Sequence, residues 1–224
     1  MKATLENAIR LYHGKRYAAA LKELHELDEE PADVPELAYY LGLCYTQLRE
    51  YEDALIYLEQ VVTSDADLVH IYQSRMILSY IYTITGRHRL ARFELDSLLE
   101  SGYESAQVYS AYGYVCYETG KVEQAVNYLK RAIEIDPENA NALNSYGYIL
   151  AELDRDLHYA LRLCKRAVEQ DDGNPAYLDS LGWVHYKLGE YDESLFYLRR
   201  APSASGGDKE KADRKAAELG VKAF

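Results

Sequence analysis

The segment YSAYGYVCYETGKVEQAVNYLKRAIEIDP, residues 109–137, decides how the chain folds. Its apolar residues recur at the spacing of two short amphipathic helices, which we expect over about 106–119 and 122–135. Between them Gly120-Lys121 forms a tight turn, because glycine readily adopts the positive φ at which many helices end. Asp136-Pro137 then ends the second helix, since proline lacks an amide donor and restricts the residue before it. The segment therefore predicts two helices joined by a tight turn, with Gly86 and Gly189 in the same turn position elsewhere in the chain.

This pair of helices repeats along the chain, as three sets of equivalent residues show. The first set holds the small residues after each turn: Ala20, Ala54, Ala91, Ala125, Ala160 and Ser194, at intervals of 34, 37, 34, 35 and 34 residues. The second keeps the same intervals: Leu27, Val61, Leu98, Ala132, Ala167 and Ala201. The third holds small residues earlier in each unit: Gly42, Ser79, Gly113, Gly147 and Gly182. Three sets in step indicate six repeats, near 1–34, 35–68, 69–105, 106–139, 140–174 and 175–207.

The triplet Tyr-Gly-Tyr, at 112–114 and again at 146–148, indicates two roles for tyrosine. A glycine inside a helix lets a neighbouring helix approach closely, and bulky residues beside it fill the adjacent gaps. We expect Tyr112 and Tyr146 to pack in this seam, as Leu41 and Leu181 do in their units. Tyr114 and Tyr148 are turned by about 200° from these residues, because an α-helix has 3.6 residues per turn. They therefore face away from the seam.

These features resemble the tetratricopeptide repeat family. Residues 109–137 and the segment LDSLGWVHYKLGEYDESLFYLRRA, residues 178–201, carry its pattern of a large apolar residue followed by Gly, a glycine turn, and spaced small and aromatic residues. The resemblance covers residues 1 to about 201 and implies an all-α, right-handed solenoid of six helix pairs. Three units depart from the pattern: the first has Ala8-Ile9, the third has Ser79 after a lengthened connection, and the fifth has the glycine-free turn of AELDRDLHYA, residues 151–160.

The pattern changes after Ala201. In PSASGGD, residues 202–208, we expect Pro202 to end the last repeat helix and Gly206-Gly207 to add flexibility. A charged helix with Asp208 as its N-cap and Gly220 as its stop then follows. We favour a C-terminal capping helix over residues 208–224, because a solenoid needs a polar cover for its last apolar face. A disordered tail and a separate partner-binding helix are the alternatives.

Composition favours a soluble protein of the cytoplasm. The 224 residues are 48% hydrophobic, which suits one folded unit with a continuous core. The net charge of −12 argues against nucleic acid as a partner, because acidic surfaces repel phosphate. We expect no membrane insertion and no exported leader in the given chain, since neither type of apolar run is present. The widely spaced Cys44, Cys116 and Cys164 are interpreted as buried apolar residues of a reducing compartment.

The sequence holds no pattern typical of an enzyme or of a cofactor or metal site. Phosphate loops, nucleophile elbows, zinc motifs and C-x-x-C pairs are all missing. The six histidines fall in different units without metal-ligand spacing, so we expect them at the surface or at its boundary. The basic cluster GRHRLAR, residues 86–92, opens a helix where positive charge opposes the dipole. An anionic partner for this cluster is therefore an alternative to a simple surface role.

Aromatic residues on the first helices suggest a binding groove. The resemblance implies that the first helices line a concave face where ligands bind. The residue that points away from the seam is aromatic in four successive units: Tyr80, Tyr114, Tyr148 and Trp183. Neighbours on the same face, by helical spacing, are Tyr39, Tyr117, Asn144, Asp179 and Tyr186. Tyrosine joins an apolar plate to a polar tip and suits peptide recognition, and Asn144 suits a peptide backbone. The alternative is that these aromatics only stiffen the stack.

The function implied is a non-enzymatic scaffold that binds a protein or peptide partner in this groove. Family members that grip the acidic tail of a chaperone carry lysine, asparagine and arginine on their first helices. Here the equivalent positions are Tyr39 and Leu43, Met76 and Tyr80, Ser110 and Tyr114, and Asn144 and Tyr148. The ligand is therefore expected to be apolar, aromatic or basic. The alternative is self-assembly, in which copies of the chain associate through their terminal repeats.

Overall fold

The described part of the chain, residues 4–205 of the computed structural model, is entirely helical, and its side chains are described as far as Ala201. It contains twelve helices, and their bounds are α1 Leu5–His13, α2 Tyr17–His25, α3 Pro35–Leu48, α4 Tyr51–Thr63, α5 Leu68–Ile84, α6 His88–Glu100, α7 Ala106–Glu118, α8 Val122–Ile135, α9 Ala140–Glu152, α10 Leu157–Gln170, α11 Pro175–Lys187 and α12 Tyr191–Ser205. The predicted all-α fold of successive helix pairs is confirmed. None of these helices has both the length and the apolar character needed to cross a bilayer.

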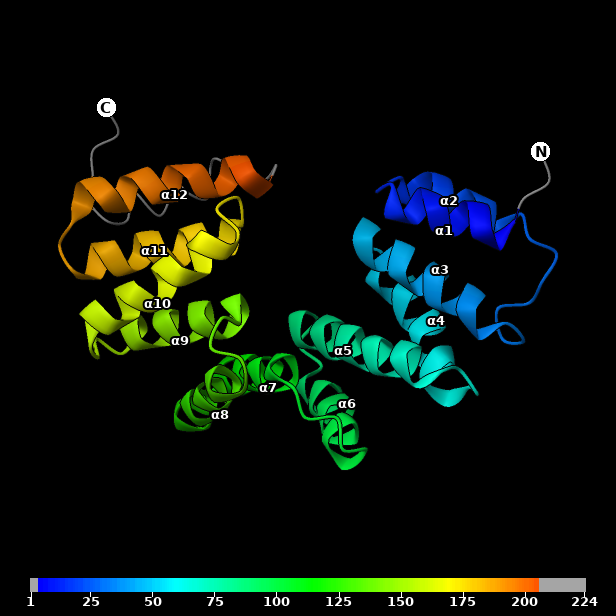
Figure 1. Ribbon diagram of the computed structural model, residues 1–224, viewed down its shortest axis with the longest axis horizontal. Coiled ribbons are helices and arrows are strands. Elements are labelled where there is room, and N and C mark those ends of the chain that lie inside the picture. The colour runs from blue at the N-terminus through cyan, green and yellow to red at the C-terminus, as the bar shows by residue number, and fades with distance from the viewer. Residues whose placement is uncertain (1–3, 206–224) are drawn as a thin grey trace. The chain divides into compact units, whose positions relative to one another are not determined.

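The chain divides into two compact units, Met1–Glu104 and Ser105–Phe224. The first unit holds α1 to α6 and the second holds α7 to α12, and within each unit consecutive helices lie side by side in pairs (Figure 1). The first helices of successive pairs also touch: α1 meets α3 and α3 meets α5, while α9 meets both α7 and α11. Each unit therefore has one face built from first helices.

The seam predicted around the glycines is confirmed. Tyr112 is 2% exposed and stacks on Tyr128 of the paired helix, with ring centroids 4.7 Å apart, whereas Tyr114 is 39% exposed. A Cβ placed on Gly113 would lie 2.5 Å from Cγ of Leu129, which is itself buried. The missing side chain is thus what allows α7 and α8 to approach. Tyr146, Leu41 and Leu181 are buried in the same way.

The turn inside every pair has a residue in the left-handed conformation, and the turn of the fifth pair has two, Asp154 and Asp156. The predicted glycines have positive φ angles, 76° at Gly86, 73° at Gly120 and 79° at Gly189. Three pairs use another residue there: Lys15, Arg49 and Asp154. In the fifth unit, which has no glycine in its turn, Asp154 takes the left-handed position, because aspartate is among the residues that tolerate this conformation best. The extra residue of that turn brings in Asp156, whose side chain accepts from the amide of Tyr159 and caps α10.

One predicted helix end is wrong. Helix α12 does not stop before Pro202 but continues to Ser205. Proline has a helical φ, so a last turn can include it, at the cost of one backbone hydrogen bond and of crowding between its ring and the carbonyl group four residues before. The predictions for Gly206-Gly207 and for a capping helix over 208–224 lie outside the described residues.

A second correction concerns the histidines. His185 was expected at the surface or its boundary, yet only 4% of it is exposed. Its ring stacks on Tyr197 at 5.4 Å, and its Nδ1 lies 2.6 Å from Oε2 of Glu190. Glu190 sits just beyond the glycine turn, five residues away, so the turn that joins α11 to α12 carries the partner of the buried ring.

The three cysteines are buried as free thiols, as predicted. Burial raises the pKa of both Cys44 and Cys164 to about 12. At pH 8 a thiol with this pKa is ionised in only about one molecule in 10⁴, and the thiolate is the reactive form. We therefore expect these two thiols to resist Ellman's reagent in the native protein and to react within minutes in denaturant. Fast labelling of Cys44 or Cys164, located by mass spectrometry in the folded protein, would contradict this prediction.

Candidate functional site

The face that α7, α9 and α11 form in the second unit is hollowed by a pocket of about 250 Å³, which we call the tyrosine pocket. Its lining residues come from these three helices alone: Tyr114, Tyr117, Glu118, Asn144, Ser145, Tyr148, Ile149, Ala176, Asp179 and Ser180. Five of the residues predicted for the groove meet here: Tyr114, Tyr117, Asn144, Tyr148 and Asp179. Helical periodicity thus placed residues from three repeats on one surface.

The aromatic wall of the pocket is held by contacts between neighbouring helices. The rings of Tyr117 on α7 and Tyr148 on α9 meet edge to face, with centroids 6.0 Å apart and planes at 84°. Their hydroxyls are hydrogen bonded to one another. Tyr114 lies one helical turn before Tyr117 and is the most exposed of the three tyrosines, since Tyr117 and Tyr148 are only partly exposed. The pocket therefore presents a rigid tyrosine pair beside a more accessible tyrosine.

Asn144 provides a buried polar group in the pocket wall. Its side-chain oxygen Oδ1 is shielded from solvent, and no described residue donates a hydrogen bond to it. Buried polar groups are nearly always paired, because an unsatisfied acceptor costs about 1–3 kcal/mol.

The electrostatic character of the pocket is acidic. Glu118 and Asp179 belong to the lining, and no lysine, arginine or histidine does. Burial raises the pKa of Tyr148 well above its ordinary value, with Glu152 the next cause and Asp179 a smaller one. Burial and then Glu152 likewise raise the pKa of Tyr117. The tyrosine hydroxyls therefore stay neutral in a negative field.

Two further predicted residues, Trp183 and Tyr186, stack on one another beyond the pocket. Their ring centroids are 5.3 Å apart with planes at 22°, and Tyr186 also meets Tyr191 of α12 at 5.8 Å. Nζ of Lys187 lies 5.6 Å from the centre of the Trp183 ring and 2.7 Å from Oδ1 of Asp154. The indole thus packs against its own helix and a paired lysine, outside the pocket lining.

The remaining predicted residues, Tyr39 and Tyr80, belong to the first unit. Tyr39 is only 6% exposed, because its ring packs on His70 of α5 at 4.2 Å and its hydroxyl donates to Gln73. It is a core residue, and we leave it out of the proposed site. Tyr80 is half exposed on α5, and its hydroxyl is hydrogen bonded to Tyr51.

Five pocket residues were missed from the sequence: Glu118, Ser145, Ile149, Ala176 and Ser180. Helical spacing could have found two of them. Glu118 follows Tyr114 by four residues and Ala176 precedes Asp179 by three, which places each on the same face as its predicted neighbour. Ser145 and Ser180 lie directly beside Asn144 and Asp179. Their small side chains gave no signal of their own.

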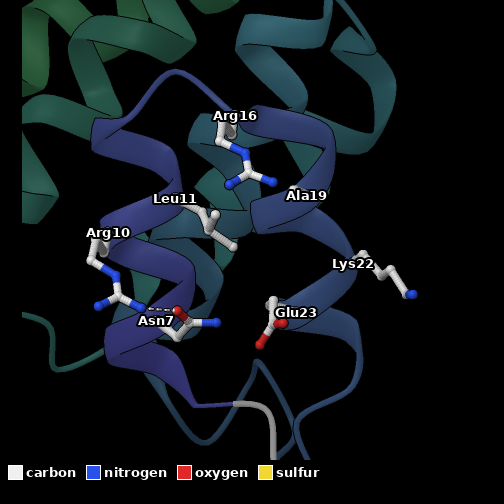
Figure 2. Close-up of a pocket in the computed structure, with 7 residues that line it drawn as sticks. All are labelled: Asn7, Arg10, Leu11, Arg16, Ala19, Lys22 and Glu23. Carbon is white, nitrogen blue, oxygen red and sulfur yellow. Dashed lines mark hydrogen bonds between the residues drawn. The ribbon is translucent and has the colours of Figure 1, made fainter. Parts of the chain in front are cut away.

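A second hollow, of about 560 Å³, lies between α1 and α2 in the first unit. Figure 2 shows Arg16 reaching into the space between the two helices, Glu23 facing it from α2, and Lys22 pointing away. Arg10 donates to Oδ1 of Asn7 at 2.5 Å. The lining of this hollow is mainly polar, Arg10 and Asn7 at its edge bond to one another, and no aromatic residue lines it.

One residue of the basic cluster at 86–92, Arg87, has an ion-pair partner within the chain. Arg87 pairs with Glu52 of α4, with Nη2 and Oε1 2.6 Å apart. Arg87 is also the N-cap residue of α6 and makes no side-chain capping bond. Among the described residues, no group of histidine, cysteine, aspartate or glutamate is arranged to hold a metal ion.

Sequence models of one family match three parts of the chain. Models described as "Tetratricopeptide repeat" match residues 5–68 and 176–205, and one described as "TPR repeat" matches residues 113–154. Together these matches cover more than half of the sequence. The chain is a tetratricopeptide repeat protein. Proteins of this family mediate protein–protein interactions and are typically non-enzymatic scaffolds.

Solved structures share the fold of this tetratricopeptide repeat protein at low identity. A tetratricopeptide repeat protein from Parabacteroides merdae matches with a TM-score of 0.76 and 11% identity, over 97% of this chain and 83% of the other. MamA protein matches at 0.51 and 17%, over 85% and 97%. YrrB, described as "a TPR protein with an unusual peptide-binding site", matches at 0.50 and 19%, over 90% and 97%. A search of curated proteins gave no match.

Proposed function

We propose that this tetratricopeptide repeat protein is a non-enzymatic scaffold that docks an extended segment of a partner protein in the tyrosine pocket. The segment would lie across the first helices of the second unit. Its side chains would pack on Tyr114 and Tyr148, and its backbone would hydrogen bond to Asn144. Tyr114, Tyr117 and Tyr148 supply contact area at a small entropic cost, because a tyrosine side chain has few rotatable bonds.

The buried oxygen of Asn144 carries this proposal. An acceptor that is shielded from solvent and receives no donor from the described residues is costly in a folded protein. Asn144 belongs to the lining of a pocket that also includes Tyr117 and Tyr148. A peptide offers backbone N–H donors at regular spacing, so a bound segment would satisfy Oδ1 while its side chains cover the rings. The role of the family in protein–protein interaction supports the same ligand class.

The test is selection of random displayed peptides on the purified protein, followed by affinity measurement with synthetic versions of those enriched. We expect the double variant Tyr114→Ala/Tyr148→Ala to weaken their binding by at least about tenfold, because two aromatic contacts are lost. Arg16→Ala, in the hollow between α1 and α2, is the matched control and should leave binding unchanged. Circular dichroism and thermal melting establish that each variant folds. Equal binding by a well-folded double variant would reject the pocket as the docking site.

The alternative, self-assembly through terminal repeats, has a structural feature in its favour. Helix α12 exposes the large rings of Tyr191 and Phe196, which are 54% and 57% accessible. Exposed aromatic residues on a terminal helix favour association with another surface. Light scattering over a range of concentrations separates the two functions, because only self-assembly makes the mass depend on concentration.

A further inference from the structure

We propose that the tyrosine pocket takes the lysine or arginine side chain of a basic segment in the partner protein. This inference rests on the proposed function of the same pocket and names the chemistry of its ligand. Three observations carry it: the aromatic faces, the distribution of charge on the three helices, and the size of the cavity.

The aromatic faces suit a cation. Lysine and arginine side chains are attracted to the π face of a tyrosine, and arginine also stacks on it. The perpendicular arrangement of Tyr117 and Tyr148 gives the pocket two walls of different orientation, and Tyr114 adds a third ring to the lining. The aliphatic stem of a lysine or arginine would pack along these rings while its charged end reaches the carboxylates.

The distribution of charge is one-sided. Helices α7 and α9 contain no lysine, arginine or histidine, and each ends in a glutamate, Glu118 and Glu152. Asp179 adds a carboxylate from α11. The basic residues of α11 are His185 and Lys187, and both already pair with carboxylates, Glu190 and Asp154. The described residues of these three helices therefore place carboxylates on this face, and both of their basic residues are paired with carboxylates elsewhere.

The same charges disfavour the other ligand classes. Burial is the main cause of the raised pKa of Tyr117 and Tyr148, and Glu152 is the next cause for both. A further anion beside these hydroxyls would be repelled by the same glutamate. A purely apolar side chain would cover the rings but would partly desolvate the Glu118 carboxylate without bringing a positive charge to it. A cation is attracted by the negative groups and also compensates the charge of a carboxylate that the ligand desolvates.

The volume favours one side chain over a larger molecule. Pockets for drug-sized ligands enclose roughly 300–1,000 Å³, whereas the tyrosine pocket has about 250 Å³. Asn144 fits this interpretation, because its carbonyl oxygen can accept from a backbone N–H of the segment or from the cation itself. The remaining length of the segment would lie outside the pocket, on the surface of the first helices.

The test uses the displayed random peptides that depend on Tyr114 and Tyr148 for binding. We expect these peptides to share a lysine or arginine, and its replacement by norleucine to weaken binding about tenfold. The variant Glu118→Gln/Asp179→Asn should weaken binding of the basic peptides by a similar factor, and binding of the norleucine peptides by less than about twofold. Glu169→Gln/Glu193→Gln, which removes the same charge from α10 and α12, is the matched control and should change binding by less than about twofold.

Each outcome decides between the two proposals. Peptides that need Tyr114 and Tyr148 but bind equally well with norleucine would overturn the basic ligand and leave the docking pocket in place. Peptides that bind independently of both tyrosines, or no enrichment at all, would overturn the docking function and this inference with it. Binding of free lysine amide as tightly as of the whole peptides would overturn the assignment to a protein segment.

Discussion

Replacing Arg75 by methionine is expected to lower the free energy of unfolding by about 3 kcal/mol, because it leaves a buried carboxylate without its partner. Arg75 on α5 donates from Nη1 to Oε2 of Glu94 on α6 at 2.6 Å. Both groups are largely removed from solvent, with side chains 20% and 8% exposed. The loss of stability comes from leaving the Glu94 carboxylate buried and unpaired, because replacing both partners of a buried ion pair by apolar residues often leaves stability unchanged. Urea denaturation followed by circular dichroism measures the change.

The pH dependence of this loss identifies its cause. Burial raises the pKa of Glu94 above its ordinary value, although the Arg75 guanidinium opposes that rise and Glu59 adds to it. Without Arg75 the pKa of Glu94 rises further, so the folded variant takes up a proton that the unfolded chain releases. Lowering the pH through this range therefore favours the folded variant. We expect the difference from the wild type to be largest near pH 8 and to shrink towards pH 5.

A double variant provides the control. Arg75→Met/Glu94→Leu removes both charges and should recover most of the lost stability, because no buried charge remains. A loss that stays constant between pH 8 and pH 5, with no recovery in the double variant, would mean that Arg75 contributes packing rather than charge. The expected result in turn would show that this ion pair fixes how α5 and α6 join, at the repeat where Ser79 replaces the glycine.

The helix pairs could be predicted from the sequence because each rests on local chemistry. The spacing of small residues, the glycine turns and the placement of Tyr112 against Tyr114 all follow from helical periodicity and from the conformations that glycine allows. Periodicity also placed Asn144 and Tyr148 on the face where the tyrosine pocket lies. These features depend on residues within one repeat or on adjacent first helices.

Features that depend on how far a side chain reaches could not be predicted in this way. Tyr39 occupies the same repeat position as Asn144 and Asp179, three residues before the small residue of its unit. The direction from the helix is shared, but the long ring of Tyr39 extends to α5, where His70 and Gln73 bury it. The shorter side chains of Asn144 and Asp179 stay at the pocket. Burial of the Asn144 oxygen likewise depends on three helices together, which no single repeat specifies.

Replacing Gly147 by alanine is expected to destabilise the second unit by about 1–2 kcal/mol, although alanine favours helices. Overpacking a core costs about 1–3 kcal/mol, and helix propensity returns up to about 1 kcal/mol. An added Cβ would lie 2.5 Å from Sγ of Cys164 and 3.0 Å from the carbonyl oxygen of Ala160. The backbone oxygen cannot rotate away as a side chain can, so α9 and α10 must move apart. Urea denaturation gives the change in unfolding free energy.

Two further variants separate this clash from a general effect of losing glycine. Gly173→Ala meets only Oδ1 of Asp171, at the ordinary distance of 3.6 Å, so it should be within about 0.5 kcal/mol of the wild type. Cys164→Ala removes the sulfur, and in the Gly147→Ala background it should cost less than it does alone, because it relieves the closest contact. Strict additivity of the two changes would reject the clash. A smaller cost of Cys164→Ala in the Gly147→Ala background would establish that Gly147 allows the close approach of α9 and α10.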